Sequence, residues 1–270
     1  MNDFVKAYRA ATKKLDLSAY STKDKRLVPD SKADRKAKAD ALGEKLNALQ
    51  DVLYGQGKHR VLVVLQGMDT AGKDGTIRHV FQHTDPLGMR VQAFKVLSEA
   101  ERARDYLWRV HQVVPKDGEI VIFNRSHYED VLTTLVHDVI DEAEFKRRLA
   151  HINDFERMLS ETGTTIIKFF LHISKDEQRE RLQARLDNPD KHWKFNPSDL
   201  NDRKLWDKFQ QTYAAAISAT DNEHAPWYII PADSKSSRDV IILEILLAHL
   251  QKLDLAYPEV DSSNWVKTVV

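Results

Sequence analysis

The loop Gly67-Met68-Asp69-Thr70-Ala71-Gly72-Lys73 carries the residue types and spacing best suited to chemistry in this chain. It fits the pattern Gly-x-x-x-x-Gly-Lys and lies between an apolar run at 61–65 and a helical pattern that begins at Lys73. In that context backbone N–H groups converge on phosphate oxygens, the next helix points its positive end at them, and the lysine adds a full charge. The sequence therefore predicts polyphosphate chemistry, but it leaves open whether a phosphoryl group is transferred or only held. The predicted phosphate-binding residues of this segment are Gly67, Ala71, Gly72, Lys73, Asp74, Gly75 and Thr76.

Two polar residues are candidate ligands of a metal ion. Asp69 lies inside the loop, where phosphates would repel a carboxylate unless a cation lay between them, and Mg²⁺ takes carboxylate oxygen readily. The Ser or Thr that usually follows the loop lysine and meets Mg²⁺ is replaced by Asp74. Asn124 ends a third apolar run, where P-loop enzymes usually offer an acid to the metal. We predict Asp69 and Asn124 as metal residues and Mg²⁺ as the cofactor; the alternative for Asp69 is a turn residue bonded to its own backbone.

Arg125 follows Asn124 and is the first of the candidate catalytic arginines. A planar guanidinium matches phosphate oxygens in pairs, so Arg125 could brace a phosphoryl group in transit; the alternative is a surface salt bridge. Ser126 and Glu129 need no chemical role, because Ser-x-x-Glu is an adequate helix start.

A charged helix is expected over 174–186, beginning with Ser174 as its cap and carrying Arg181 and Arg185 on one face. Leu182 and Leu186 share another face, which we expect to point inward. Lys194 lies in the polar, aromatic-dotted stretch beyond the helix. Basic side chains on a mobile segment over the loop would form a lid that closes on substrate and expels water. The alternative is a solvated helix with charge pairs such as Glu177–Arg181.

The rest of the chain alternates strand and helix patterns, which implies parallel strands joined by right-handed crossovers. Such a sheet is covered on both faces and binds ligands at the carboxyl ends of its strands, where the glycine-rich loop would lie. Strands are expected at 61–65, 91–96, 120–123, 166–171 and 227–230, and helices at 33–53, 73–83, 98–113, from 126, at 142–160, at 174–186, between 204 and 227, and at 238–253. We therefore expect one domain: a three-layer α/β/α P-loop fold around a five-stranded parallel sheet.

Composition limits the class of protein. The 270 residues contain no cysteine and carry 41 basic against 41 acidic side chains, which suits a cytoplasmic protein and gives no case for nucleic acid. No apolar run is long enough for a membrane span. The charge is uneven, because residues 1–38 hold eleven Lys and Arg against five acids. This basic arm could attract a polyanion, pack on an acidic neighbour, or be a solvated terminus.

Other sites fit the sequence poorly. His79 and His83 are spaced for zinc, but the metalloprotease glutamate and a third ligand are missing. No Gly-x-Ser-x-Gly hydrolase motif occurs.

Four segments together resemble the polyphosphate kinase 2 family, over about residues 40–257. They are Gly67-Met68-Asp69-Thr70-Ala71-Gly72-Lys73-Asp74-Gly75, Phe123-Asn124-Arg125-Ser126-His127-Tyr128-Glu129-Asp130-Val131, Lys191-His192-Trp193-Lys194-Phe195-Asn196-Pro197 and Ala225-Pro226-Trp227-Tyr228-Ile229-Ile230-Pro231-Ala232-Asp233. The resemblance implies a fold like that of nucleoside monophosphate kinases, with a helical lid at about 175–205, a kinase domain over 39–257 and a tail over 258–270.

The same resemblance implies Mg²⁺-dependent, reversible transfer of a terminal phosphoryl group between inorganic polyphosphate and AMP or ADP. Asp69 would be the metal-linked acid, Lys73 the phosphate-binding lysine, Arg125 the arginine of the second motif and Arg185 a lid arginine. Many members have Asp where this chain has Asn124, and the Asn form resembles the subgroup that accepts both AMP and ADP. Two alternatives stay open: an ATP-dependent kinase of thymidylate-kinase type and a nucleotide-binding switch without catalysis. We expect a homo-oligomer with no membrane or nucleic-acid partner.

Overall fold

The computed structural model describes residues 2–10, 14–261, 263 and 265. Its elements are α1 (Asp3–Tyr8), η1 (Leu17–Ala19), α2 (Lys32–Gln56), β1 (Arg60–Gln66), α3 (Lys73–Val80), η2 (Pro86–Gly88), β2 (Met89–Ala93), α4 (Glu99–Arg102), α5 (Trp108–His111), β3 (Ile120–Asn124), α6 (Glu129–Val136), α7 (Glu142–Glu161), β4 (Thr164–His172), α8 (Lys175–Leu186), η3 (Pro189–Lys194), α9 (Ser198–Lys204), α10 (Trp206–Thr220), β5 (Trp227–Pro231) and α11 (Lys235–Leu250).

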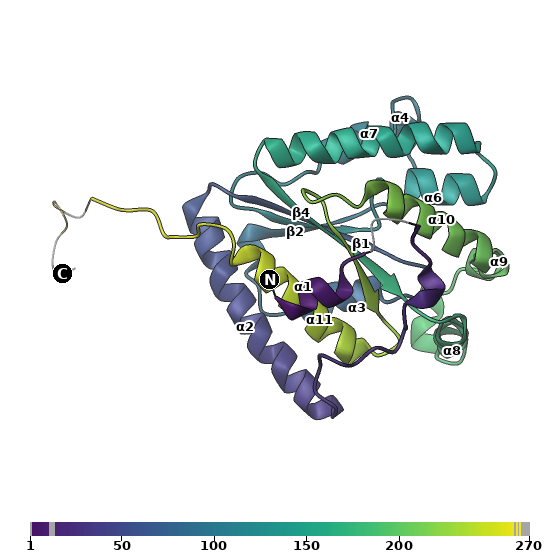
Figure 1. Cartoon of the computed structure of the whole chain (residues 1–270), viewed down its shortest axis with the longest axis horizontal. Coiled ribbons are helices and arrows are strands. Elements are labelled where there is room, and N and C mark those ends of the chain that lie inside the picture. The colour runs from purple at the N-terminus through teal and green to yellow at the C-terminus, as the bar shows by residue number, and fades with distance from the viewer. Residues whose placement is uncertain (1, 11–13, 262, 264, 266–270) are drawn as a thin grey trace.

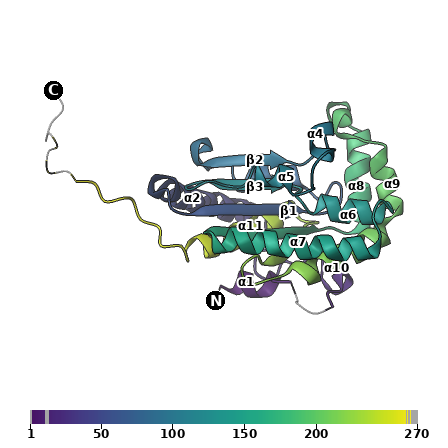
Figure 2. The ribbon, with the colours of Figure 1, turned by 90° about the horizontal axis from the view of Figure 1, so that it is seen from above.

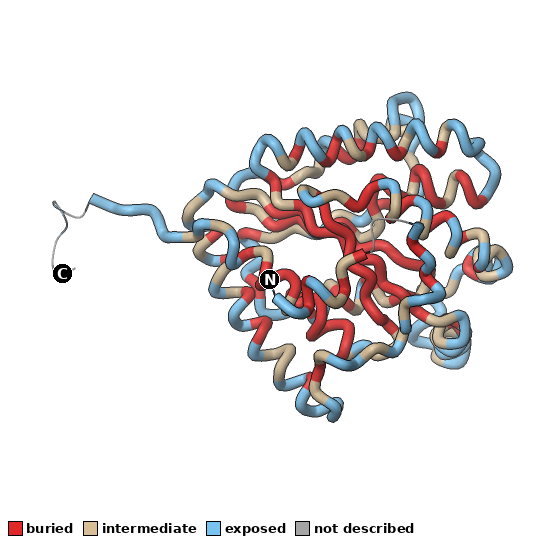
Figure 3. The backbone as a smooth tube through the Cα atoms, viewed as in Figure 1, coloured by how far each residue is buried: buried red, intermediate tan, exposed pale blue. Residues whose placement is uncertain are grey.

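The five strands form one sheet in the order β2-β3-β1-β4-β5, and every neighbouring pair is parallel. The three central strands are apolar and buried on both faces, as expected of a parallel sheet covered by helices. Helices α2, α3 and α11 lie on one side and α6, α7 and α10 on the other (Figure 1). The buried positions follow the strands and the inner helix faces (Figure 3). The predicted three-layer α/β/α fold is confirmed.

All the strands point toward the same end of the molecule, where α8 and α9 lie across their tips (Figure 2). The loop after β1 therefore opens beneath α8, at the edge where ligands bind in such sheets. At the opposite end, the chain beyond α11 runs away from the domain (Figure 2).

The basic N-terminal arm packs on the domain instead of forming a solvated end. Phe4, Val5 and Tyr8 are buried, and Ala10 N donates to Trp227 O at 2.9 Å. Arg9 pairs with Asp221 at 3.0 Å. The apolar residues of the arm and Arg9 are therefore packed on the domain, as the alternative of packing on an acidic neighbour predicts, whereas basic side chains such as Lys6, Lys25 and Lys36 are exposed to solvent. The boundary expected at residue 38 falls inside α2, Lys13 lies outside the described residues, and so does much of the expected tail (262, 264 and 266–270).

One expected helix is interrupted in the structure. The single helix predicted over 98–113 is split into α4 and α5. The Asp105 carboxylate accepts from Leu107 N at 2.9 Å, which is the local bond that competes with helix formation. The polar stretch after α8 lies within the segment for which the resemblance implied a helical lid, and it folds into η3 and α9.

Candidate functional site

The glycine-rich loop joins β1 to α3, with Gly72 immediately before the first residue of the helix. Gly72 has φ of 105°, in the region that favours glycine. A Cβ there would overlap Nη1 of Arg238, whose side chain is buried. At Gly67 a Cβ would lie 2.8 Å from Leu171 O, so both glycines are needed for the loop to keep this shape.

Lys73 turns back into its own loop. Its Nζ donates to Gly67 O at 2.7 Å and to Met68 O at 3.3 Å. Burial lowers the pKa of this ammonium group, and the nearby Arg125 cation lowers it further. Two carbonyl dipoles only partly offset that desolvation, so an anion entering the loop would supply the missing charge partner.

Arg125 projects from the end of β3 toward the loop. Its Nη2 donates to Asp69 Oδ1 at 2.9 Å and its Nη1 to Glu129 Oε2 at 3.1 Å. The carboxylate of Glu129, followed by that of Asp69, raises the pKa of the guanidinium against the opposing effect of burial. The helix-start reading of Ser126 and Glu129 is wrong, because α6 begins without a side-chain cap and Glu129 is used to hold Arg125.

The turn that presents Arg125 is locked from beneath. Arg125 has φ of 64°, a conformation that costs a non-glycine residue about 1–2 kcal/mol. The residues after it are buried, and Tyr128 donates its hydroxyl to Glu156 Oε1 at 2.9 Å. Lys168, in the middle of β4, pairs with Glu156 and donates to Tyr128 Oη at 3.0 Å. A buried charge pair on the sheet thus fixes the turn that orients the site arginine.

Arg181 of α8 bridges the loop and the end of β5. Its Nη1 donates to Thr70 O at 2.9 Å and its Nη2 to Ala232 O at 2.6 Å. Its Nε also pairs with Glu177 at 2.7 Å, so the charge pair of the alternative reading exists beside the loop contact.

Arg185, near the end of α8, holds the segments that follow this helix. Arg185 Nη1 donates to Lys194 O at 2.9 Å and to Asp199 Oδ2 at 3.1 Å. The expectation that both leucines of α8 face inward is half right, because Leu182 is buried whereas Leu186 is 42% exposed. Leu186 is the last residue of the helix.

These elements enclose a cleft of about 630 Å³ over the loop. Ten Lys and Arg side chains line it against three Asp: Lys73, Arg78, Lys95, Arg125, Arg181, Arg185, Lys191, Lys194, Lys235 and Arg238, with Asp69, Asp74 and Asp199. Of the predicted site residues, Asp69, Gly72, Lys73, Asp74, Gly75, Asn124, Arg125, Arg181, Arg185 and Lys194 line this cleft together.

Three predicted residues do not line the cleft. Gly67 lies beneath it, and Ala71 N donates to Met68 O at 3.0 Å. Thr76 is buried within α3, where its N–H and its hydroxyl both donate to Gly72 O. Ala71 and Thr76 thus shape the loop with N–H groups that already donate to its carbonyls, and Gly67 shapes it by its close approach to Leu171.

Six charged residues of the cleft were not among the predicted site residues: Arg78, Lys95, Lys191, Asp199, Lys235 and Arg238. Lys235 and Arg238 come from the start of α11, and Arg238 Nη1 donates to Gly72 O at 3.3 Å. Asp199 comes from α9, and burial together with the charge of Asp69 raises its pKa to about 6. The available signal was that Lys235 follows a strand end by only a few residues, at the edge where the loop lies.

The oxygen ligands in the cleft are of the kind that Mg²⁺ prefers. Asp69, Asp74 and Asn124 all line it, and Asn124 donates its amide N–H to Asp74, which leaves the amide oxygen as a ligand. No group of three His, Cys, Asp or Glu side chains that could hold a metal occurs among the described residues. That arrangement fits Mg²⁺, which is commonly held by one or two carboxylates and by the substrate phosphates.

A parallel sheet, a Gly-x-x-x-x-Gly-Lys loop leading into a helix, and a cation-lined cleft define a P-loop phosphate-binding protein. The family model for Polyphosphate kinase 2 (PPK2) matches residues 29–257. The chain belongs to this family, so the resemblance seen in the sequence is confirmed.

Individual proteins that resemble this chain support its assignment to the family. An AMP/ADP-polyphosphate phosphotransferase of Meiothermus ruber is 56% identical over 223 residues, which are 83% of this chain and 84% of the relative. An ADP-polyphosphate phosphotransferase of Rhodopseudomonas palustris is 42% identical over 80% of this chain and 79% of its own length. The crystal structure of polyphosphate kinase 2 from Arthrobacter aurescens superposes with a TM-score of 0.92 at 41% identity, over 96% of this chain and 92% of that one.

Proposed function

We propose that this protein transfers the terminal phosphoryl group of inorganic polyphosphate to AMP and to ADP, in a reversible, Mg²⁺-dependent reaction. The observation that carries the proposal is the cleft in which ten cationic side chains face three carboxylates above the P-loop. The relative at 56% identity, named for both AMP and ADP, supports the choice of acceptors.

The residues present suit this reaction. A nucleotide's terminal phosphate is already an anion near neutral pH, so the attacking oxygen needs no general base; the task is to align two polyanions and neutralise their charge. Lys73 and the loop N–H groups would hold the donor phosphates, with Gly72 and Gly75 allowing close approach. Mg²⁺, when bound beside Asp69 and Asn124, would neutralise charge that develops on the phosphoryl oxygens.

Arg125 is proposed to act on the transferred group itself. Its guanidinium already bonds to Asp69 at 2.9 Å and keeps further N–H groups toward the cleft that it lines. Arg185 and Lys194, joined at 2.9 Å, are proposed to close over the acceptor side as a lid. Arg181 would add charge where the loop meets α8.

The finer points are also proposals. We infer a cytoplasmic homo-oligomer that uses neither a membrane nor a nucleic acid as partner. The absence of cysteine from the sequence suits a reducing compartment. No helix in the described part of the chain is long and apolar enough to cross a bilayer. Light scattering after size-exclusion chromatography would test the subunit number, and a monomer at assay concentration would contradict it.

Product analysis tests the function. AMP, polyphosphate and Mg²⁺, with ATP left out, should yield ADP first and ATP later, as resolved by anion-exchange chromatography. The matched reaction with ATP and AMP but no polyphosphate tests the ATP-dependent kinase reading. A Lys73→Met variant, similar in length but uncharged, serves as the inactive control. Formation of product only in the ATP reaction, or in neither, would overturn the proposal.

A further inference from the structure

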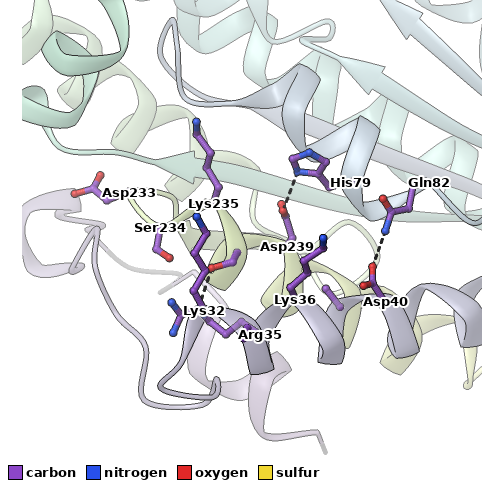
Figure 4. Close-up of a pocket in the computed structure, with 13 residues that line it drawn as sticks. Lys32, Arg35, Lys36, Asp40, His79, Gln82, Asp233, Ser234, Lys235 and Asp239 are labelled. Carbon is purple, nitrogen blue, oxygen red and sulfur yellow. Dashed lines mark hydrogen bonds and ion pairs between the residues drawn. The ribbon is translucent and has the colours of Figure 1, made fainter. Parts of the chain in front are cut away.

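A second hollow, of about 860 Å³, lies beside the P-loop cleft (Figure 4). It is bounded by the first turns of α2, by α3, and by the start of α11. His79 and Lys235 line both this groove and the P-loop cleft, so the two adjoin. We call it the α2 groove.

The walls of the α2 groove are tied to each other. Arg35, buried in the first turns of α2, donates its Nε to Ser236 Oγ at 2.9 Å, and its Nη1 to Pro29 O at 2.8 Å. These bonds join the start of α2 to the start of α11, and they use the charged group of Arg35 within the protein. The groove is therefore a fixed feature of the fold rather than a gap between loosely packed helices.

The carboxylates of the α2 groove are all engaged with other side chains or N–H groups. Their partners are His79 and Arg238 for Asp239, Gln82 for Asp40, and Thr22 with Ser174 for Asp233. All three carboxylates therefore have hydrogen-bond partners, and the charge of Asp239 is paired with the guanidinium of Arg238.

Three lysines of the α2 groove have no such partner. Lys32 and Lys36 lie one turn apart on α2 and are exposed, and Lys235 is the first residue of α11 (Figure 4). None of the three forms a hydrogen bond or ion pair with any residue that the structure describes. Partial burial lowers the pKa of Lys235, and the cations of Arg181 and Arg238 lower it further. An anion bound beside Lys235 would reduce this repulsion between cations.

These lysines continue the line of cations that begins at the P-loop. Arg238 contacts Gly72 of the loop, Lys235 lies one turn earlier on the same helix, and the lysines of α2 face it across the groove. Apart from His79, none of the described residues that line the groove is aromatic, so they offer little for stacking a nucleotide base. Separated lysines act as point charges and suit repeated, identical anionic units.

We propose that the α2 groove holds the part of a polyphosphate chain that extends beyond its reacting end. This inference rests on the proposed function. The P-loop cleft would bind the terminal phosphates of the chain, and Lys235, Lys32 and Lys36 would bind the phosphates that follow. A short donor would then be bound by the cleft alone, whereas a long donor would gain contacts with both hollows.

The test compares donors of two lengths with the variant K32A/K36A in the full chain. The control is K45A, because Lys45 is an exposed lysine of the same helix that lines neither hollow. With AMP saturating, KM is measured for tripolyphosphate and for a long-chain polyphosphate fraction. The double variant should raise KM for the long chain by about fivefold, from two lost surface charge contacts. Its KM for tripolyphosphate and its kcat with either donor should match the parent, and K45A should match the parent throughout.

Equal changes in KM for both donors, or no change for the long one, would overturn the inference while leaving the proposed function intact. If the parent fails to phosphorylate AMP at all, the proposed function is wrong. The inference about the groove is then tested by the binding of polyphosphate instead. In that case calorimetry with the long-chain fraction alone should show weaker binding and a smaller salt dependence for K32A/K36A than for K45A. Identical binding by the two variants would exclude the groove as a polyphosphate site.

Discussion

Replacing Arg125 with lysine tests the centre of the proposed mechanism. The substitution keeps the positive charge and the same left-handed backbone, so the local backbone cost is the same in both proteins. It removes the planar fork that now reaches Asp69 at 2.9 Å and Glu129 at 3.1 Å, since one ammonium group cannot keep both bonds and also meet a phosphoryl group.

At least one charge-assisted hydrogen bond should be lost in the transition state, which is worth about 1.5–3 kcal/mol. Because about 1.4 kcal/mol corresponds to a tenfold change in rate, kcat should fall by about ten- to a hundredfold. KM for AMP should stay within about threefold, because the lost contact forms mainly in the transition state.

The assay is the initial rate of ADP formation from AMP and polyphosphate, with thermal unfolding recorded in parallel. R147K is the matched control, because the side chain of Arg147 is 61% exposed on α7 and, within the part of the chain that the structure describes, pairs only with Glu144. If R125K kept more than half of the parent kcat, or lost activity only through KM, then Arg125 would not act on the transferred group.

Further predictions concern the loop and its cover. Asp69→Ala should lose activity far more than AMP affinity and need more Mg²⁺ for half-activation; a near-parental Mg²⁺ titration would refute its metal role. Gly72→Ala places a Cβ against the buried Arg238 at a φ of 105°, so calorimetry should show polyphosphate binding weakened by about tenfold or more; parental affinity would mean that the loop adapts. The pKa of Asp199 is about 6, so this side chain is neutral at lower pH and gains a charge that repels the donor as pH rises. KM for polyphosphate should therefore rise from about pH 5 to about pH 7, and less so in Asp199→Asn, which corrects for titration of the donor itself. Identical pH profiles of KM in the parent and in Asp199→Asn would exclude Asp199 as the source of the pH dependence.

The sheet and the loop were predictable because their signals are local. A short β-forming run followed by Gly-x-x-x-x-Gly-Lys identifies the strand, the turn and the helix start together. In the structure Gly72 is the residue immediately before α3. Ser98 likewise forms a capping box with Glu101 at the start expected for the helix over 98–113. Each pattern involves residues within a few positions of one another, so the tertiary structure has little opportunity to override it.

The parts that sequence reasoning missed depend on contacts between distant segments. Arg238 reaches Gly72 only because α11 packs beside α3. Glu129 matched a helix-start pattern, but the arginine four residues before it uses the carboxylate instead. Lys168 lies within the strand expected at 166–171, and no pattern in the neighbouring sequence indicates that Glu156 is its partner. These pairings follow from the fold and cannot be inferred from spacing in one sequence.

The buried pair of Lys168 and Glu156 restricts how this protein can change over evolutionary time. Losing either partner alone would strand an ion inside the domain, at a cost of about 3–5 kcal/mol, which is a large share of a typical domain's stability. Substitution at the two positions should therefore be correlated, with both replaced or neither. Selection for a correctly oriented Arg125 would then act on buried residues that never contact a substrate.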